Sequence, residues 1–589
     1  MSEDTPQKEI RFQGAGVSPG IARGMIHVVR DDFDDVARYR IAASQVSDEI
    51  GRFEAALIQT RMQILEMQQR IAESIGAKDA GIFDAHLLVV EDRTLIDEVL
   101  RKLEADLCNV EWVFQEVASG YAETLNKIDD PYLRERALDI TDVTKRVIRN
   151  LQGKAPKTFL TLTEPHILVA HNLTPSDTAT MNKERVLGLA TDLGSRTSHT
   201  AIMARSLSIP AVVGLHNVTQ KLETGQEVLV DGTNGLLIVD PTPETLAHYG
   251  EVESKRVRIA KQLTELRETI STTRDGRHVV LSANIELPDD VDAVIANGAE
   301  GVGLYRTEFL YLNRDTLPTE EEQYETYRKV AERVQPAPLI IRTFDMGGDK
   351  LAAGAAEVSD ELNPFLGCRA IRFCLENIDI FKTQLRAILR ASAVGNVKVM
   401  FPMISGLDEV RRATSALNEC REDLRRAGAV CGDTMEVGAM IEIPSAAISA
   451  DLLAREVDFF SIGTNDLIQY AIAVDRVNER IAHLYEPTHP AVLRLLKMIA
   501  DAGHANKIWV GVCGEMAGDV ALIPILLGLG MDELSVGATL VPRVKRAVQS
   551  LSVAECQQLV DESLKLQTPS EILNRCLELA GQRYGDLLG

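Results

Sequence analysis

The chain lacks both a long apolar run and an apolar leader. None of its apolar stretches approaches the roughly 18 residues needed to cross a bilayer, and the polar start, residues 1–12, has no signal-like core. We therefore expect a cytoplasmic protein that does not insert into membranes. At roughly 150 residues per domain, the 589 residues suggest several folding units rather than one.

Basic residues are also scarce. Lysine and arginine together number 63 against 87 acidic residues, which gives a formal net charge of −24. Such a surface repels nucleic acid and anionic membranes, so we expect no nucleic-acid partner. Any basic group that binds an anion must then act within a local site.

Two kinds of signature motif are missing. The eight cysteines contain no C-x-x-C pair, which argues against a zinc ribbon or a thioredoxin-type redox site. The glycines between positions 14 and 24 interrupt strand-like text but form no dinucleotide-binding fingerprint. A functional thiol would therefore act alone.

A block of helical text interrupts the first half of the chain. Apolar residues in the segment 47–75 recur at intervals of three, four and seven, as on one face of a long helix, and Ser47 is a candidate cap. The pattern predicts an inserted antiparallel bundle. Further helical text occupies 80–99, 111–127 and 131–151.

Strand-like text lies on both sides of these helices and predicts a compact α/β unit. It is followed at 243–270 by a charged stretch with little glycine, which predicts a solvated helix linking two halves. The strand-like runs are 9–30, 167–170, 186–190, 211–213 and 227–230.

The second half is more regular and contains eight β-rich runs. Most are separated by helical text of the length that a parallel crossover needs, so a closed (β/α)₈ barrel explains the count better than a doubly wound open sheet, which remains an alternative. The runs are 278–283, 302–305, 339–342, 397–402, 437–442, 459–462, 508–513 and 533–536.

Polar residues end several of these runs, where the active site of such a barrel lies. Guanidinium groups match phosphate and carboxylate oxygens, so the arginines suit a small doubly anionic substrate. Two carboxylates beside a phosphorylated ligand suit Mg²⁺, and a thiol can deliver a proton. Ordinary ion pairs and a buried structural cysteine are the alternatives. The candidates are Arg306, Arg342, Arg369, Arg476, Glu442, Asn465, Asp466 and Cys513.

One histidine stands apart from the other ten. His199 begins an apparent helix after a glycine-containing turn in DLGSRTSHTAIMARS. Free backbone N–H groups and the helix dipole at such a start favour a phosphate. We therefore interpret His199 as a phosphate carrier and the remaining histidines as structural.

Several long motifs in register resemble the enzyme I family of the bacterial phosphoenolpyruvate-dependent sugar phosphotransferase system, over essentially the whole chain. The phosphohistidine signature of that family is similar to the segment around His199. The motifs are GSRTSHTAIMARS, LYRTEFL, DMGGDK, NPFLGCRAIR, MIEIP, SIGTNDLIQY, AVDR and GVCGEMAGD.

The resemblance implies an activity and its residues. The chain would transfer phosphate from phosphoenolpyruvate to Nε2 of His199, with Thr178 orienting the ring, and then to a histidine of the carrier protein HPr, releasing pyruvate. Cys513 would protonate the departing enolate. Phosphoenolpyruvate would be bound by Arg306, Arg342, Arg369, Asn465, Asp466 and Arg476, and Mg²⁺ by Glu442 and Asp466.

The resemblance also implies an organisation. A swivelling phosphohistidine domain would comprise 1–32 and 152–242, with an HPr-binding helical domain, 33–151, inserted in it. A linker helix, 243–272, would lead to a barrel, 273–589, that binds phosphoenolpyruvate and forms a homodimer. One departure is Cys368, where we expect a tryptophan beside Arg369.

Three further expectations follow. Hinges should lie near 151–157 and 239–245. The chain has no room for the ATP-grasp domain of related dikinases, and its swivel-like text begins too early for the sensor domain of the nitrogen-related paralogue. The alternatives are a lyase barrel acting on phosphoenolpyruvate and a purely regulatory phosphotransfer protein.

Overall fold

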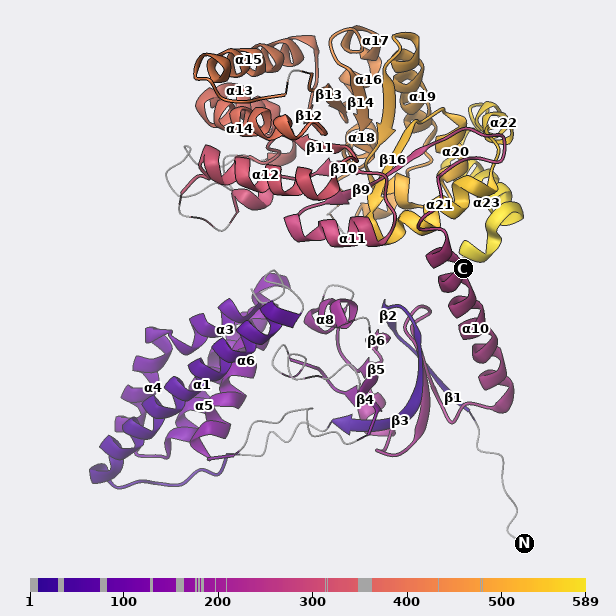
Figure 1. Cartoon of the computed structure of the whole chain (residues 1–589). Helices are drawn as coiled ribbons and strands as arrows, with labels where there is room; N and C mark the ends of the chain where they lie inside the picture. The colour runs from indigo at the N-terminus through magenta and orange to yellow at the C-terminus, as the bar shows by residue number, and fades with distance from the viewer. Residues whose placement is uncertain are drawn as a thin grey trace. The chain divides into compact units, whose positions relative to one another are not determined.

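The computed structural model consists of two compact units, Met1–Lys255 and Arg256–Gly589 (Figure 1). No helix within the described part of the chain is both long and apolar enough to span a membrane. The described residues are 9–29, 36–74, 82–127, 131–154, 164–174, 177, 181, 185–195, 198–207, 209–312, 314, 316–347, 363–432, 434–476, 478 and 480–588.

The first unit contains the predicted helical bundle. Its helices share a buried apolar core that includes Phe53, Phe114 and Val143. Periodic apolar positions explain this packing, because one stripe of each helix faces the core. The helices are α1 (Val46–Ser74), α3 (Ile82–Val90), α4 (Arg93–Asp106), α5 (Val110–Asn126) and α6 (Pro131–Leu151).

Two details of the predicted bundle are wrong. The segment expected to be one helix over 80–99 is broken, because Asp92 caps a new helix: its carboxylate accepts the backbone N–H groups of Thr94 at 2.8 Å and Leu95 at 3.2 Å. Such a side chain satisfies the free donors at a helix start. Ser47 is not a cap, since α1 already begins at Val46.

The same unit contains the expected α/β part, built on an eight-stranded sheet. Its order is β1-β8-β7-β3-β4-β5-β6-β2, with a buried apolar cluster on each face. The sequence pattern missed β8. The strands are β1 (Ile10–Gln13), β2 (Ala15–Ser18), β3 (Ile21–Val29), β4 (His166–Ala170), β5 (Val186–Thr191), β6 (Ala211–Val213), β7 (Glu227–Asp231) and β8 (Leu236–Val239).

Gly14 joins the two ends of this sheet. It alone separates β1 from β2, which lie at opposite ends of the strand order. Its backbone N–H donates to the carbonyl of Gly235 at 2.9 Å. A Cβ here would approach the carbonyl oxygen of Val213 to 2.5 Å, so only glycine fits.

The linker helix α10 (Pro243–Glu265) starts against the sheet of the first unit. The Tyr249 hydroxyl donates to Asp231 at 3.1 Å, and Arg11 donates to the Thr245 hydroxyl at 3.4 Å. The backbone of Thr242 donates to Glu9 at 2.9 Å. These contacts fall in and beside the predicted hinge 239–245, which remains a prediction. The other predicted hinge, 151–157, extends outside the described residues.

The second unit is a closed barrel of eight parallel strands, as the sequence predicted. A doubly wound open sheet is therefore excluded. The strands are β9 (Val280–Ile285), β10 (Val302–Tyr305), β11 (Leu339–Arg342), β12 (Val397–Phe401), β13 (Val437–Ile441), β14 (Phe459–Ile462), β15 (Trp509–Val512) and β16 (Glu533–Gly537).

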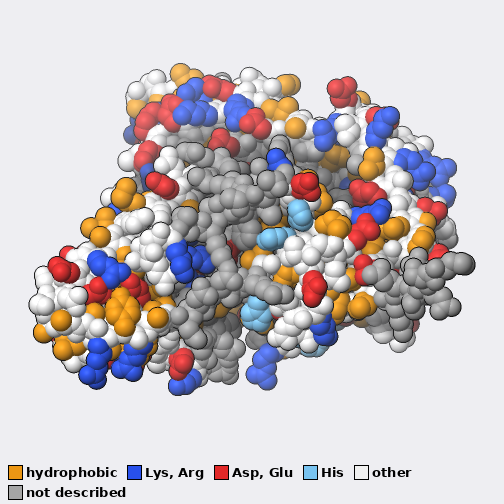
Figure 2. Space-filling model, turned by 90° about the horizontal axis from the view of Figure 1, so that it is seen from below, with side chains coloured by type: hydrophobic (Ala, Val, Ile, Leu, Met, Phe, Trp, Pro, Cys, Tyr) orange, Lys and Arg blue, Asp and Glu red, His pale blue; other side chains and the backbone are white. Residues whose placement is uncertain are grey.

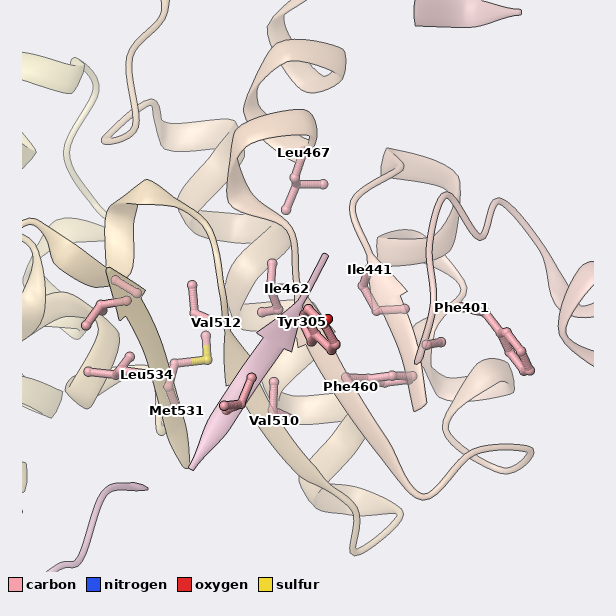
Figure 3. Close-up of a cluster of buried hydrophobic side chains, with 14 of the residues drawn as sticks. Tyr305, Phe401, Ile441, Phe460, Ile462, Leu467, Val510, Val512, Met531 and Leu534 are labelled. Atoms are coloured by element: carbon pink, nitrogen blue, oxygen red, sulfur yellow. The ribbon is translucent and has the colours of Figure 1, made fainter. Parts of the chain in front are cut away.

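Helices surround the barrel and cover the outward faces of its strands. Figure 3 shows part of the core between the two layers, with Phe460 and Ile462 of β14 beside Val510 and Val512 of β15. The helices are α11 (Val291–Ala296), α12 (Glu320–Val334), α13 (Ile371–Glu376), α14 (Ile378–Ala391), α15 (Leu407–Arg426), α16 (Pro444–Ile448), α17 (Ala450–Leu453), α18 (Thr464–Ile472), α19 (Pro490–Ala505), α20 (Ile523–Gly528), α21 (Val541–Ser550), α22 (Val553–Ser563) and α23 (Pro569–Tyr584).

A second, smaller cluster fills the inside of the barrel. Cys513 belongs to it, at the carboxyl end of β15. The other buried members are Leu304, Ile340, Met400, Met440 and Phe459. A closed barrel of this kind is packed inside and has no pore, so its site lies at the mouth.

Charged side chains of both signs lie on the face of the molecule drawn in Figure 2. On the face drawn in Figure 2, lysines and arginines are interspersed with aspartates and glutamates and do not gather into one large basic patch.

Candidate active site

The predicted barrel residues occupy the carboxyl ends of neighbouring strands. Arg342 is the last residue of β11, and Arg306, Glu442 and Cys513 directly follow β10, β13 and β15. Asn465 and Asp466 stand in the first turn of α18, which follows β14. The parallel barrel brings these strand ends together at one mouth.

Arg342 is held by two acidic side chains that were not predicted from the sequence. One of its terminal nitrogens lies 2.9 Å from Oε1 of Glu308, and the other lies 2.8 Å from Oδ2 of Asp345. Only 9% of Arg342 is exposed. Burial alone would lower its pKa, but the two carboxylates raise it above the ordinary value, so the side chain stays charged.

Asp345 also holds a second predicted substrate arginine. Its Oδ1 accepts hydrogen bonds from Nη2 of Arg369 at 2.8 Å and from Nε at 3.2 Å. Nη2 of Arg369 lies 4.0 Å from Oδ2 of Asp466. Acidic and basic groups thus alternate from Glu308 through the two arginines to Asp466.

Glu442 is a deeply buried carboxylate in the same site. Its Oε1 accepts the backbone N–H of Met403 at 2.6 Å. Burial, followed by the charges of Asp345 and Asp466, raises the pKa of Glu442 well above its usual range. Burial and the charge of Asp345 likewise raise the pKa of Asp466, against the opposing effect of Arg369.

This mutual repulsion is what a divalent cation would relieve. Glu442 and Asp466 are oxygen donors, which Mg²⁺ prefers, and it takes only one or two protein carboxylates beside substrate phosphate and water. Within the described ranges no group of three or more histidines, cysteines, aspartates or glutamates has metal-binding geometry. The residues therefore fit a cation completed by a ligand, and they do not form an all-protein cage.

Cys513 is a buried thiol that belongs to the apolar cluster inside the barrel. Its Sγ donates to the carbonyl of Ile462 at 3.6 Å, and 3% of the residue is exposed. Burial raises the pKa of Cys513 to about 11, while Arg342 and Arg306 act in the opposite direction. The thiol therefore carries its proton at neutral pH.

A more exposed group lies beside these residues. The Asn465 amide donates to Glu515 at 3.2 Å and accepts the backbone N–H of Glu515 at 2.9 Å. Arg476 lies 4.0 Å from the same carboxylate. Arg306 pairs with Glu286 at 2.7 Å. Neither glutamate was predicted from the sequence, although Glu515 stands two residues after Cys513 in GVCGE.

His199 belongs to the first unit, whereas the residues of the barrel mouth belong to the second. As predicted, it is the first residue of α8 (His199–Leu207). Ser198 precedes the helix, and its hydroxyl accepts the N–H of Ala201 at 3.4 Å and donates to the carbonyl of Ser195 at 2.9 Å. The imidazole of His199 and the whole of Thr178 lie outside what the structure describes.

The helix α8 packs on both parts of the first unit. Ala201, Ala204 and Leu207 belong to an apolar cluster of the sheet, whereas Met203 belongs to the core of the helical bundle. The Thr200 hydroxyl donates to the carbonyl of Leu173 at 3.1 Å. The start of α8 is therefore fixed next to both the sheet and the bundle.

Three family models match successive parts of the chain. The "PEP-utilising enzyme, N-terminal" model matches residues 13–136, and the "PEP-utilising enzyme, mobile domain" model matches residues 162–235. The "PEP-utilising enzyme, PEP-binding domain" model matches residues 260–553, which include the barrel mouth.

Curated relatives match nearly the whole chain. A phosphoenolpyruvate-protein phosphotransferase of Bacillus sp. (strain S) is 47% identical over 570 residues, covering 96% of this chain and 98% of the relative. The one from Bacillus subtilis (strain 168) is 46% identical, covering 95% and 98%. A solution structure of an Enzyme I (nEIt) protein is 41% identical, with a TM-score of 0.36, and covers 41% of this chain and 98% of its own.

Proposed function

The chain belongs to the phosphoenolpyruvate-protein phosphotransferases, and we propose that it works in two steps, from phosphoenolpyruvate to His199 and from His199 to a histidine of HPr. The observation that carries the first step is the barrel mouth, where buried arginines, two mutually repelling carboxylates and a protonated thiol converge. This set matches the phosphate, carboxylate and methylene carbon of one small substrate.

The arginines bind and orient the substrate. Arg342 and Arg369 are buried or nearly so and stay charged, and guanidinium groups bind phosphate and carboxylate oxygens in pairs. Arg306, Arg476 and Asn465 contribute further donors from the more exposed side. Because there is little covalent chemistry for the protein to do in phosphoryl transfer, this positioning and charge stabilisation supply most of the catalysis.

Glu442 and Asp466 would hold Mg²⁺. When bound there, the ion neutralises negative charge on the phosphate oxygens of the substrate. The support from the chain is that burial, followed by the charge of Asp345, raises the pKa of both carboxylates, and the charge of Asp466 adds to the effect on Glu442.

Bond changes in the first step balance without a further reactant. The bond between phosphorus and the enol oxygen breaks, and a bond forms between phosphorus and Nε2 of His199. The enolate takes a proton from the Cys513 thiol at its methylene carbon and becomes pyruvate. The thiol must then regain a proton from solvent before the next turnover.

The helical bundle would receive HPr in the second step. Exposed apolar side chains on two neighbouring helices support a docking surface: Ile58 is 63% exposed and Met62 58% on α1, and Leu88 is 67% exposed on α3. Large apolar side chains that gather on a surface often mark a protein interface. The domain boundaries given by the resemblance, a homodimer through the barrel and a cytoplasmic location belong to the same proposal.

Labelled phosphoenolpyruvate tests the first step. With Mg²⁺, the wild-type chain should acquire an acid-labile phosphoryl label that His199→Gln abolishes. The matched control is His504→Gln, because His504 bonds to Asp532 at 2.9 Å, away from the strand ends that form the site, and should label normally. Label retained in His199→Gln would refute the assignment. Pyruvate release without any label would favour a lyase.

Labelled protein tests the second step. Purified HPr should remove the label from the chain and become labelled itself. If the label stays on the chain with every sugar-transport HPr offered, the regulatory alternative would be favoured over a role in sugar uptake.

A further inference from the structure

We propose that Asp345 is a positioning residue for substrate binding, because one carboxylate sets the orientation of two substrate arginines at once. This inference rests on the proposed function of the barrel mouth, and it assigns a role to a residue outside the set of substrate, metal and proton-donor residues described above. Asp345 itself is not placed against the substrate.

The two oxygens of Asp345 are divided between the two arginines. Oδ2 lies 2.8 Å from a terminal nitrogen of Arg342, and Oδ1 accepts both Nη2 and Nε of Arg369. The side chain of Asp345 is only 3% exposed. Water therefore screens these pairs weakly, and charge-assisted bonds of this kind are stronger than neutral ones.

The backbone around Asp345 is held in turn. Glu308 accepts the N–H of Asp345 at 3.1 Å with the same Oε1 that pairs with Arg342. Gly347, two residues after Asp345, forms a β-bridge with Arg369. These backbone contacts fix the position of the Asp345 carboxylate. The carboxylate in turn fixes the orientation of both guanidinium groups.

Fixing a guanidinium group fixes its remaining donors, because the group is planar. Both terminal nitrogens of Arg342 are engaged by acids, whereas its buried Nε has no hydrogen-bond partner within the described residues. A planar group held at two nitrogens can direct its free N–H in one direction only. Rotation of either arginine would change the spacing of the donors that meet the substrate.

Asparagine tests this role because it has the shape of aspartate but only one acceptor oxygen. In Asp345→Asn, the amide would present N–H donors to one of the two arginines, so one guanidinium group loses its partner. We expect the KM for phosphoenolpyruvate to rise roughly 30-fold, as for a lost hydrogen bond to a charged group, with kcat changed less than about threefold.

A matched control is Asp532→Asn. Asp532 also joins two nitrogen-bearing side chains, Arg277 at 3.0 Å and His504 at 2.9 Å, but it precedes β16 and therefore lies at the opposite, amino-terminal ends of the strands. This variant should lower thermal stability and leave the KM unchanged. An equal rise of KM in both variants would show a general structural effect and overturn the inference.

Asp345→Glu is the rescue variant. It restores two carboxylate oxygens, displaced by one methylene, so its KM should fall between those of wild type and Asp345→Asn. If Asp345→Asn does not fold, Asp345→Glu decides alone: a several-fold higher KM at unchanged kcat supports the role, and a wild-type KM overturns it.

The assay is steady-state pyruvate release with excess HPr and varied phosphoenolpyruvate, using the full chain. Each variant, once labelled, should pass its label to HPr at the wild-type rate, since that step does not use the barrel mouth. If the wild-type chain acquires no label from phosphoenolpyruvate, the proposed function is wrong. If the wild type is labelled normally and the KM of Asp345→Asn is unchanged, only the positioning role of Asp345 is wrong.

Discussion

Gly463 leaves the space in which the carboxylate of Glu442 lies. A Cβ on residue 463 would stand 2.5 Å from Oε2 of Glu442 and 3.0 Å from its Cβ. The backbone of Gly463 has φ near −81°, which any residue can adopt, so the effect of a side chain here would come from the close approach to Glu442 and not from backbone strain. The residue that follows β14 thus limits the position of the carboxylate that follows the neighbouring strand β13.

Gly463→Ala should therefore weaken magnesium binding without removing a charged group. The added methyl group displaces Glu442, and we expect the Mg²⁺ concentration for half-maximal labelling to rise at least tenfold. A magnesium titration of label formation at saturating phosphoenolpyruvate measures this. Gly581→Ala is the control, because nothing lies within 4 Å of a Cβ there. An unchanged magnesium requirement in Gly463→Ala would show that Glu442 holds no ion.

Magnesium should stabilise the protein more at high pH than at low pH. The raised pKa values of Glu442 and Asp466 mean that the folded state holds their protons more tightly than the unfolded state. Without Mg²⁺, their contribution to the free energy of unfolding is therefore largest at low pH and is lost as the pH rises through the folded values. Metal ligands must be deprotonated, so the affinity for Mg²⁺, and with it the stabilisation by Mg²⁺, rises as the two carboxylates lose their protons.

The measurement is the Tm with and without MgCl₂ at pH 5.5 and pH 8, at constant ionic strength. At a concentration 100-fold above its Kd, an ion adds about 2.7 kcal/mol to the free energy of unfolding. Glu442→Gln and Asp466→Asn should lose most of this gain. A magnesium effect that is equal at both pH values, or equal in the variants, would place the ion elsewhere.

Cys513→Ser should slow catalysis without weakening substrate binding. Its thiol is protonated at neutral pH because burial raises its pKa to about 11, and general acid catalysis typically contributes 10²- to 10⁴-fold. We expect kcat for pyruvate release to fall by about that factor, with the KM changed less than about threefold. A serine variant at full rate would exclude the thiol as the proton donor.

The same pKa predicts how Cys513 reacts with iodoacetamide. The thiolate is the reactive form, so alkylation of this residue, followed by peptide mass spectrometry, should be slow at pH 7 and rise about tenfold per pH unit. The partly exposed Cys431 is the internal reference. Rapid modification of Cys513 at pH 7 would contradict its burial.

Leu88→Glu should impair only the second transfer. Leu88 is 67% exposed on α3, and a charge there would oppose docking of an apolar partner surface. We expect HPr to remove the label at least tenfold more slowly, while labelling by phosphoenolpyruvate stays normal. Val430→Glu, in a barrel residue that is 76% exposed, is the control. Equal transfer in both variants would place HPr elsewhere.

The barrel could be predicted closely from the sequence because its strands are buried on both faces. Such strands appear as continuous apolar runs, and the predicted ends at Tyr305, Arg342 and Ile462 coincide with the ends of β10, β11 and β14. Residues at the carboxyl ends of parallel barrel strands meet at one mouth, so the amino-acid sequence was enough to group Arg306, Glu442 and Cys513.

The partners of these residues could not be predicted, because no local signal joins them. Asp345 and Arg369 are 24 positions apart, and Asp345 is one of 87 acidic residues. The break at Asp92 was missed for a related reason: apolar residues at Val90 and Leu95 continue the helical pattern across it. β8 was missed although its residues, Leu236–Val239, form a continuous apolar run of the kind that located the barrel strands.

The attachment of α8 to the rest of the first unit is unequal on its two sides. Toward the sheet it contributes three apolar residues, and Arg205 donates to the carbonyl of Val17 at 3.2 Å. Toward the bundle, Met203 is its one buried apolar member among the described residues. If the two parts separate during turnover, the helix that begins with His199 moves with the sheet, and the packing of Met203 in the bundle core must be broken.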